Sequence, residues 1–209
     1  MMLHHTQHTM TRTALHLNLL VFLLSLFFVN PQTTQAISVS HRALPSFADF
    51  RRSVQNGEAD ALRGVYVEDV LKLPVVQQPA TDAYYVSTRN GEATQFALAS
   101  QYGNTGLLAH NTLSGRMFSN LAIGQDVRLV YGDGRVEYFV IKRILRFQAL
   151  DPDSISSTFR NLDRNETLSA GEMFNRAYVG ESRLVFQTCI EANGNVSWGR
   201  LFVIALPKR

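Results

Sequence analysis

The sequence predicts a mostly β protein whose strands form a closed or nearly closed barrel. From Gly64 onward, short runs rich in β-branched and aromatic residues alternate with Gly, Pro and Asn breakers. Clear helix signals occur in only two places, one before Gly64 and one within a polar interval late in the chain. Many short strands at close spacing, with few helices, are typical of all-β barrels.

The composition fits a globular domain and excludes several classes of function. Hydrophobic residues make up 45% of the chain and charged residues 18%, which is too apolar for a disordered protein. The net charge is only +3 and the basic residues are scattered, so we expect no nucleic-acid partner. The only cysteine, Cys189, excludes an internal disulfide. In a secreted protein, a lone cysteine either bridges two molecules or is a reactive thiol.

Residues 1–36 have the three regions of a secretory signal peptide. A polar start is followed by the apolar run Ala14–Val29, and Thr34-Gln35-Ala36 is a small-x-small cleavage site. The run is slightly short for a membrane-spanning helix, which needs about 20 residues. We therefore expect cleavage after Ala36, with an uncleaved membrane anchor as the alternative. Either form places the domain outside the cytoplasm, secreted or anchored to the outer face of the cytoplasmic membrane.

Residues 37–63 are expected to form a linker and one short helix. Ser46 can cap this helix and Gly57 can end it. Three apolar residues would share one helix face: Phe47, Phe50 and Val54. We expect this face to pack against the barrel.

Residues 64–209 are expected to form the barrel domain. Gly132-Asp133-Gly134 predicts a hairpin turn between the two strongest strands. The polar residues 148–182 are long for a connection and predict a loop. Within that loop, Ser169 and Glu172 have the spacing of a capping box, so we expect a short helix over Glu172–Tyr178. The predicted strands are Val65–Glu68, Leu73–Gln77, Tyr84–Thr88, Thr94–Ala99, Leu107–Ala109, Asp126–Tyr131 and Val136–Phe147.

The stretch Arg183–Leu206 concentrates the reactive residues of the chain. Its two apolar runs, Arg183–Cys189 and Arg200–Leu206, predict a pair of strands joined by a long polar loop. If Val185 lies opposite Ile204, then Cys189 falls opposite Arg200 on the same face, with Cβ atoms about 5 Å apart. This register would bring a thiol and a guanidinium together at the end of a strand.

His110 completes a candidate catalytic set with Cys189 and Arg200. After the leader only His41 and His110 remain, and His41 precedes the first helix. A cysteine nucleophile needs thiolate character, which a nearby histidine or arginine supplies. Arginine stays protonated, so it cannot be a base, but it can stabilise an oxyanion. Each residue alone also fits a structural role, since a lone cysteine is often a small buried apolar residue. Their conjunction predicts the catalytic site.

Several motifs in order resemble the sortase family over about Gly64–Pro207. Thr188-Cys189 ends an apolar strand, and Arg200 begins the last strand. Upstream, Tyr102–Leu121 (YGNTGLLAHNTLSGRMFSNL) resembles the histidine segment of sortases, and Gly124–Val127 follows in the same order. The resemblance implies a closed β-barrel of about eight strands. It also implies that Cys189 is the nucleophile, His110 the catalytic histidine and Arg200 the catalytic arginine.

The resemblance further implies a cysteine transpeptidase that cleaves a sorting signal through a thioacyl-enzyme. The expected partners are secreted proteins bearing a sorting motif and an amine acceptor, such as a peptidoglycan peptide or a pilin lysine. We expect no cofactor and no metal, because the chain lacks the acidic set that would support calcium activation. Ala109 and Asn111 depart mildly from the histidine segment, and residues 148–182 match no sortase subclass, so the sorting motif and the substrate-binding residues stay open.

Two other functions remain compatible with the sequence. A hydrolytic cysteine endopeptidase would use the same fold and release the thioester with water. A non-catalytic secreted β-barrel would bind a wall component or another partner. The simultaneous presence of Cys189, His110 and Arg200 favours the enzyme.

Overall fold

The computed structural model describes residues 46–154 and 156–208, which lie within one compact unit. The predicted leader, its cleavage site after Ala36 and His41 lie outside the described residues. Across the described part of the chain, no helix is both long enough and apolar enough to cross a membrane.

Eight of the ten strands in the described residues close into a barrel, which confirms the predicted fold class. The barrel order is β10-β9-β4-β3-β2-β1-β5-β6, and pairing between β6 and β10 closes it. Two short strands, β7 (Phe159–Asn161) and β8 (Thr167–Leu168), extend the sheet beyond β6. The barrel strands are β1 (Leu62–Val67), β2 (Leu71–Gln77), β3 (Ala93–Gln95), β4 (Thr105–Leu108), β5 (Asp126–Tyr131), β6 (Val136–Ala149), β9 (Leu184–Ala192) and β10 (Asn195–Pro207).

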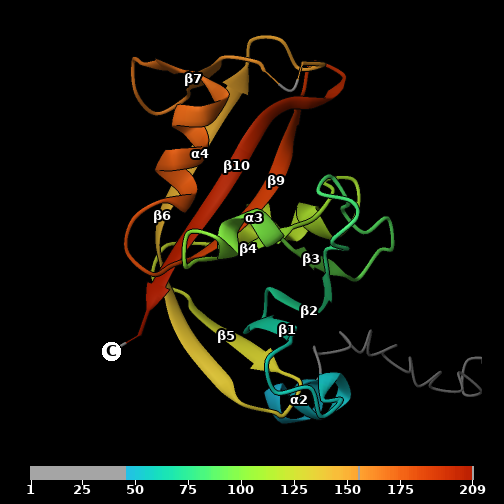
Figure 1. Ribbon diagram of the computed structural model, residues 1–209. Coiled ribbons are helices and arrows are strands. Elements are labelled where there is room, and N and C mark those ends of the chain that lie inside the picture. Colours follow the sequence, from blue (N-terminus) through green and yellow to red (C-terminus); the bar gives the residue numbers. More distant parts are fainter. Residues whose placement is uncertain (1–45, 155, 209) are drawn as a thin grey trace, which may run out of the picture. The chain divides into compact units, whose positions relative to one another are not determined.

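The first half of β9 and the middle of β10 are buried on both faces. Along β10, Leu201 and Val203 belong to the barrel interior, whereas Phe202 and Ile204 belong to a second apolar layer outside it. The second layer lies under the helix α4 (Ala170–Tyr178), which runs beside these strands in Figure 1. Because residues alternate between the two faces of a strand, two buried faces require a nearly continuous apolar run.

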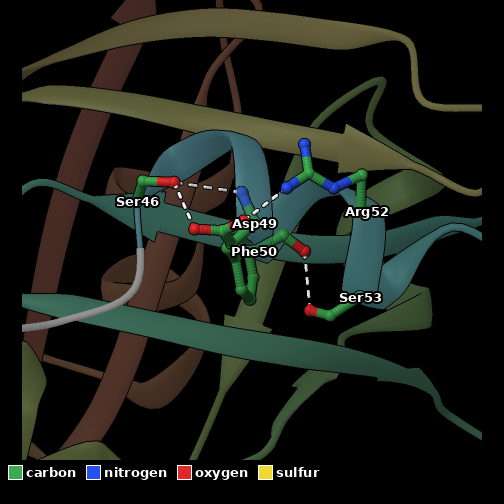
Figure 2. A network of polar contacts seen from close by, with 5 residues as sticks. All are labelled: Ser46, Asp49, Phe50, Arg52 and Ser53. Atoms are coloured by element: carbon green, nitrogen blue, oxygen red, sulfur yellow. Dashed lines mark hydrogen bonds and ion pairs between the residues drawn. The ribbon is translucent and has the colours of Figure 1, made fainter.

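The first helix, α2 (Phe47–Val54), has the predicted cap and apolar face. The Ser46 Oγ accepts a hydrogen bond from the Asp49 N–H at 3.2 Å, as Figure 2 shows, and Phe50 and Val54 are buried. The prediction that the helix ends at Gly57 is wrong, because its last residue is Val54. Beyond the helix, the backbone N–H groups of residues 56 and 57 donate to the Gly132 carbonyl, so contacts with the β5–β6 turn replace further helical bonds.

Two predicted strands differ from the structure. Tyr84–Thr88 is not a strand. Because β2 pairs in parallel with β3, this segment belongs to the connection that returns from the end of β2 to the start of β3. Thr94–Ala99 is a strand only as far as Gln95, and Ala97–Ser100 forms the short helix α3. Ala99 is buried in α3, so tertiary packing decides the conformation of this segment.

The polar residues 148–182 contain more structure than a loop. They include β7, β8 and the helix α4. The predicted capping box is confirmed, since the Ser169 N–H donates to the Glu172 carboxylate at 2.8 Å and the Glu172 N–H donates to the Ser169 Oγ at 3.3 Å. The helix begins at Ala170 rather than at the predicted Glu172, because Ser169 occupies the N-cap position.

Asn104 joins three segments of the fold and generates a stability prediction. Its side chain, only 5% exposed, donates to the Tyr178 carbonyl at 2.6 Å and accepts from the Arg183 N–H at 2.8 Å. We expect Asn104→Ala to lower the free energy of unfolding by about 2–4 kcal/mol, since each buried group left without a partner costs about 1–3 kcal/mol. Urea denaturation measures this change.

The matched control is Asn120→Ala, at an exposed asparagine that ends a 3₁₀ helix. A surface substitution of this kind should change the free energy of unfolding by less than about 0.5 kcal/mol. Equal effects of the two substitutions would contradict the bridging role of Asn104.

Candidate active site

The pairing of β9 with β10 places Cys189 opposite Arg200. Val185 lies opposite Ile204, so the register predicted from the sequence is confirmed. Cys189 is half-buried and lies one residue before Ile190, the last residue of β9 that is paired before the register shifts. Directly opposed residues lie on one face of a sheet, so the thiol and the guanidinium belong to the same face.

The prediction of a long loop between these two strands is wrong. The strands continue to a tight turn at Asn193-Gly194, where both residues have positive φ, 53° and 74°. Asn-Gly at a two-residue hairpin turn is a strong sequence signal, and it could have located this turn. Between Asn195 and Gly199 the register shifts, so β10 has a bulge directly before Arg200.

The bulge in β10 fixes the position of the Arg200 guanidinium. The Arg200 Nη1 donates to the Ser197 carbonyl at 3.0 Å and to the Gly199 carbonyl at 2.9 Å. Its Cζ lies 5.9 Å from the ring centre of Phe159 in β7. One nitrogen of the guanidinium is thereby held by backbone oxygens, which limits the orientations that the charged group can adopt.

The neighbouring strand β4 brings His110 to the same end of β9 as Cys189. β4 runs parallel to β9, with Leu108 opposite Gln187. The contact continues for one more residue, because the Ala109 N–H donates to the Gln187 carbonyl at 3.3 Å and the Thr188 Oγ1 donates to the Ala109 carbonyl at 2.8 Å. His110 and Cys189 directly follow Ala109 and Thr188, so both lie at the same end of the contact between β4 and β9. The side chain of His110 is exposed.

The backbone after His110 is held against β9 and against the bulge in β10. The N–H groups of Leu113 and Gly115 both donate to the His110 carbonyl at 2.9 Å, which winds the chain into the 3₁₀ helix η1 (Ser114–Asn120). The Asn111 Nδ2 donates to the Val196 carbonyl at 2.9 Å. Asn111, which the sequence marked only as a departure from the sortase pattern, therefore ties the histidine segment to the bulge before Arg200.

A cavity of about 640 Å³ lies beside this arrangement. Two of its lining residues, Leu108 and Gln187, precede His110 and Cys189 by two positions each. Substrate-binding residues could not be predicted from the sequence, because this cavity is assembled from separate segments with no common motif. The lining residues are Gln78, Pro79, Ala80, Ala83, Tyr84, Phe96, Ala97, Leu98, Gln101, Leu108 and Gln187.

Tyr178, the last residue of α4, supports Gln187. The Tyr178 hydroxyl donates to the Gln187 Oε1 at 2.7 Å. Burial raises the pKa of Tyr178 well above its ordinary value, so the hydroxyl stays protonated at neutral pH and remains a donor. Within the described residues, no group of three or more His, Cys, Asp or Glu side chains could hold a metal ion.

Comparison with known proteins identifies similar solved structures, but no protein-family model and no curated protein matches the sequence. Sortase C-1 from Actinomyces oris is 12% identical, covering 79% of this chain and 82% of that one, with a TM-score of 0.49. Sortase C1 from Streptococcus suis is 14% identical, covering 78% of each chain, with a TM-score of 0.47. Sortase A from Listeria monocytogenes is 13% identical, covering 72% and 89%, with a TM-score of 0.45.

Gly115 generates a prediction about the histidine segment. A Cβ added there would clash with the Thr188 Oγ1 and would lie 2.7 Å from the His110 carbonyl oxygen. We expect Gly115→Ala to lower the free energy of unfolding by about 1–3 kcal/mol, the usual cost of overpacking. Chemical denaturation, followed by circular dichroism, measures the loss.

Gly171 in α4 provides the matched control, because an added Cβ there meets nothing within 4 Å. Gly171→Ala should leave stability unchanged or raise it by up to about 1 kcal/mol, the helix propensity difference. If both variants were as stable as the wild type, close packing of Gly115 against Thr188 would not be required.

Proposed function

We propose that this protein is a sortase-type cysteine transpeptidase that acts outside the cytoplasmic membrane. One observation supports the proposal most strongly: Cys189 lies opposite Arg200, and His110 leaves the adjacent strand at the same end. These are the three residues whose chemistry suits acyl transfer through a thioester. The substrates would be secreted proteins bearing a sorting motif.

In the first half of the reaction, the Cys189 thiolate attacks the carbonyl carbon of the scissile peptide bond. The negative charge moves to the carbonyl oxygen, where the guanidinium of Arg200 stabilises it. The C–N bond then breaks, and the His110 imidazolium gives a proton to the leaving amine. The product is a thioacyl-enzyme with the acyl group on Cys189.

In the second half, an amine acceptor attacks the thioester carbonyl. His110, now neutral, accepts the proton from the amine, and the Cys189 thiolate leaves as the new amide bond forms. A peptidoglycan peptide or a pilin lysine would supply this amine, so the reaction would attach secreted proteins to the cell wall or polymerise pilins. The enzyme would be secreted or anchored to the outer face of the membrane.

The position of Arg200 suits a role in the transition state. Its charge is permanent, and the backbone oxygens of the bulge hold its Nη1. Preorganised donors stabilise a developing oxyanion without reorganising during the reaction. Asn111 would help by fixing the histidine segment to the same bulge.

The identity of the acceptor separates transpeptidation from hydrolysis. Incubation with a library of Leu-Pro-type sorting peptides, with and without amine acceptors, distinguishes them by mass spectrometry. Amide products indicate a transpeptidase, whereas free acids formed in the presence of amines indicate the endopeptidase. If no peptide acylated Cys189, the result would favour the alternative function, a non-catalytic β-barrel that binds a wall component.

Cys189→Ala should fold normally and form no covalent acyl adduct, because alanine has no nucleophile. His110→Ala should also fold, since His110 is exposed, but should turn over little peptide, because general acid–base catalysis typically contributes about 10²–10⁴-fold. Intact-protein mass spectrometry detects the adduct, and circular dichroism checks the fold. Retained turnover in Cys189→Ala would remove the proposed nucleophile.

Arg200→Lys and Arg200→Ala should both fold and lose most peptide cleavage. Removal of one oxyanion donor typically lowers kcat by about 10²–10³-fold, and lysine lacks the planar fork of donors. Alkylation of Cys189 by iodoacetamide should persist in both variants, because that reaction develops no acyl oxyanion.

Arg160→Ala serves as the matched control, since Arg160 is exposed on β7 and alternates with the buried Phe159. It should change neither rate. A parallel fall in cleavage and alkylation in the Arg200 variants would show that Arg200 sets the thiolate population or the local fold instead of stabilising the oxyanion.

A further inference from the structure

The cavity that Gln187 lines has an apolar lining interrupted by glutamines. Its walls come from the β2–β3 loop, from α3 and from the outer faces of β4 and β9. None of its lining residues carries a charge. At about 640 Å³ it has the size of a typical ligand pocket, about 300–1,000 Å³.

The position of Gln187 links this cavity to the nucleophile. Gln187 and Cys189 lie two residues apart on β9, so their side chains share a face and their Cα atoms are separated by roughly 7 Å. An extended peptide covers the same distance in two residues. An extended substrate that runs along β9, with its scissile carbonyl at the Cys189 sulfur, would therefore place a side chain two or three residues away in the cavity.

The hydrogen bond from Tyr178 fixes the orientation of the Gln187 carboxamide. Tyr178 is only 1% exposed, and its hydroxyl donates to the Gln187 Oε1 at 2.7 Å. A carboxamide oxygen has a second lone pair, and its nitrogen has two donor hydrogens. Within the described residues, no hydrogen bond uses the Gln187 Nε2, so both of its donor hydrogens and one lone pair of the neighbouring oxygen remain.

Gln78, in the same cavity wall, has a different role. Its Nε2 donates to the Ala83 and Tyr85 carbonyls at 2.9 and 3.0 Å, and its Oε1 accepts from the Ala97 N–H at 3.0 Å. Those bonds fasten the β2–β3 loop to α3. Gln78 therefore supports the wall of the cavity, whereas Gln187 can recognise what enters it.

We propose that Gln187 recognises a carboxamide side chain, that of asparagine or glutamine, two or three residues from the scissile bond of the peptide substrate. This inference rests on the proposed transpeptidase function and adds a determinant of its specificity. A carboxamide presents one donor and one acceptor side by side, so it can form two hydrogen bonds with the Gln187 amide. A carboxylate can only accept, and it would bring a charge into a cavity with no compensating cation. An aliphatic side chain would leave the Gln187 donor buried and unpaired.

The test compares isosteric substrates. Each position of a peptide that acylates Cys189 is replaced in turn by Asn, Leu and Asp, and in a second set by Gln, Met and Glu. At one position two or three residues from the scissile bond, kcat/KM should be about tenfold higher for the carboxamide than for its apolar or acidic counterpart. Gln187→Leu should abolish this preference or reverse it in favour of Leu and Met.

Two further variants separate recognition from general damage to the site. Tyr178→Phe removes only the hydroxyl that orients Gln187, so the preference should fall by about threefold while alkylation of Cys189 by iodoacetamide is unchanged. Gln148→Leu is the matched control, because Gln148 is a half-buried strand glutamine that lies opposite Gly199 on β10 and does not line the cavity. It should leave the preference intact.

A binding measurement keeps this inference distinct from the proposed function. The same peptides, fluorescently labelled, are titrated against Cys189→Ala and against the double variant with Gln187→Leu. If no peptide acylates the wild type, the proposed transpeptidase function is wrong. Recognition by Gln187 would still be supported if the Leu peptide bound Cys189→Ala about tenfold more weakly than the Asn peptide and if the double variant bound both peptides equally. The inference is overturned if peptides acylate or bind without a carboxamide preference, if Gln187→Leu leaves that preference unchanged, or if none of the peptides binds.

Discussion

The antiparallel pairing of β9 with β10 is the constraint on which the rest of the structure depends. It sets Cys189 opposite Arg200, and β10 also pairs with β6 to close the barrel. Because the side-chain period of a strand is two, a shift of the register by one residue would turn Arg200 to the opposite face and exchange the apolar residues of β10 between the barrel interior and the outer apolar layer. The burial of both faces of β10 therefore fixes the fold and the relative position of thiol and guanidinium together.

The parallel pairing of β4 with β9 adds the third residue of the proposed site. It ends just before His110 and Cys189, so the histidine begins the segment that winds into η1. Asn111 connects this segment to the Val196 carbonyl, and the same bulge holds Arg200 through neighbouring carbonyls. Backbone carbonyls at the bulge thus hold Arg200 and the segment that begins with His110.

Local signals explain which parts of the fold could be predicted. The helix caps at Ser46 and Ser169 depend on residues three positions apart, and the Gly132-Asp133-Gly134 turn depends on its own dipeptide. The errors occur where contacts with residues distant in the chain decide the local conformation. The chain around Tyr84 resembles a strand but has no edge to pair with, since β3 occupies the edge of β2. Ala97–Ser100 is helical because Ala99 packs in a buried position.

The sequence by itself determined the strand-rich class, the turn and cap positions, and the three candidate residues, because their isolation and order along the chain are properties of the chain alone. It also contained the alternation that sets Cys189 opposite Arg200. Only the tertiary structure decided that His110 lies at the end of the strand next to β9, that a bulge holds Arg200, and that Gln187 lines a cavity with Tyr178 behind it. Those contacts join residues far apart in the chain, so they depend on which strands become neighbours when the barrel closes.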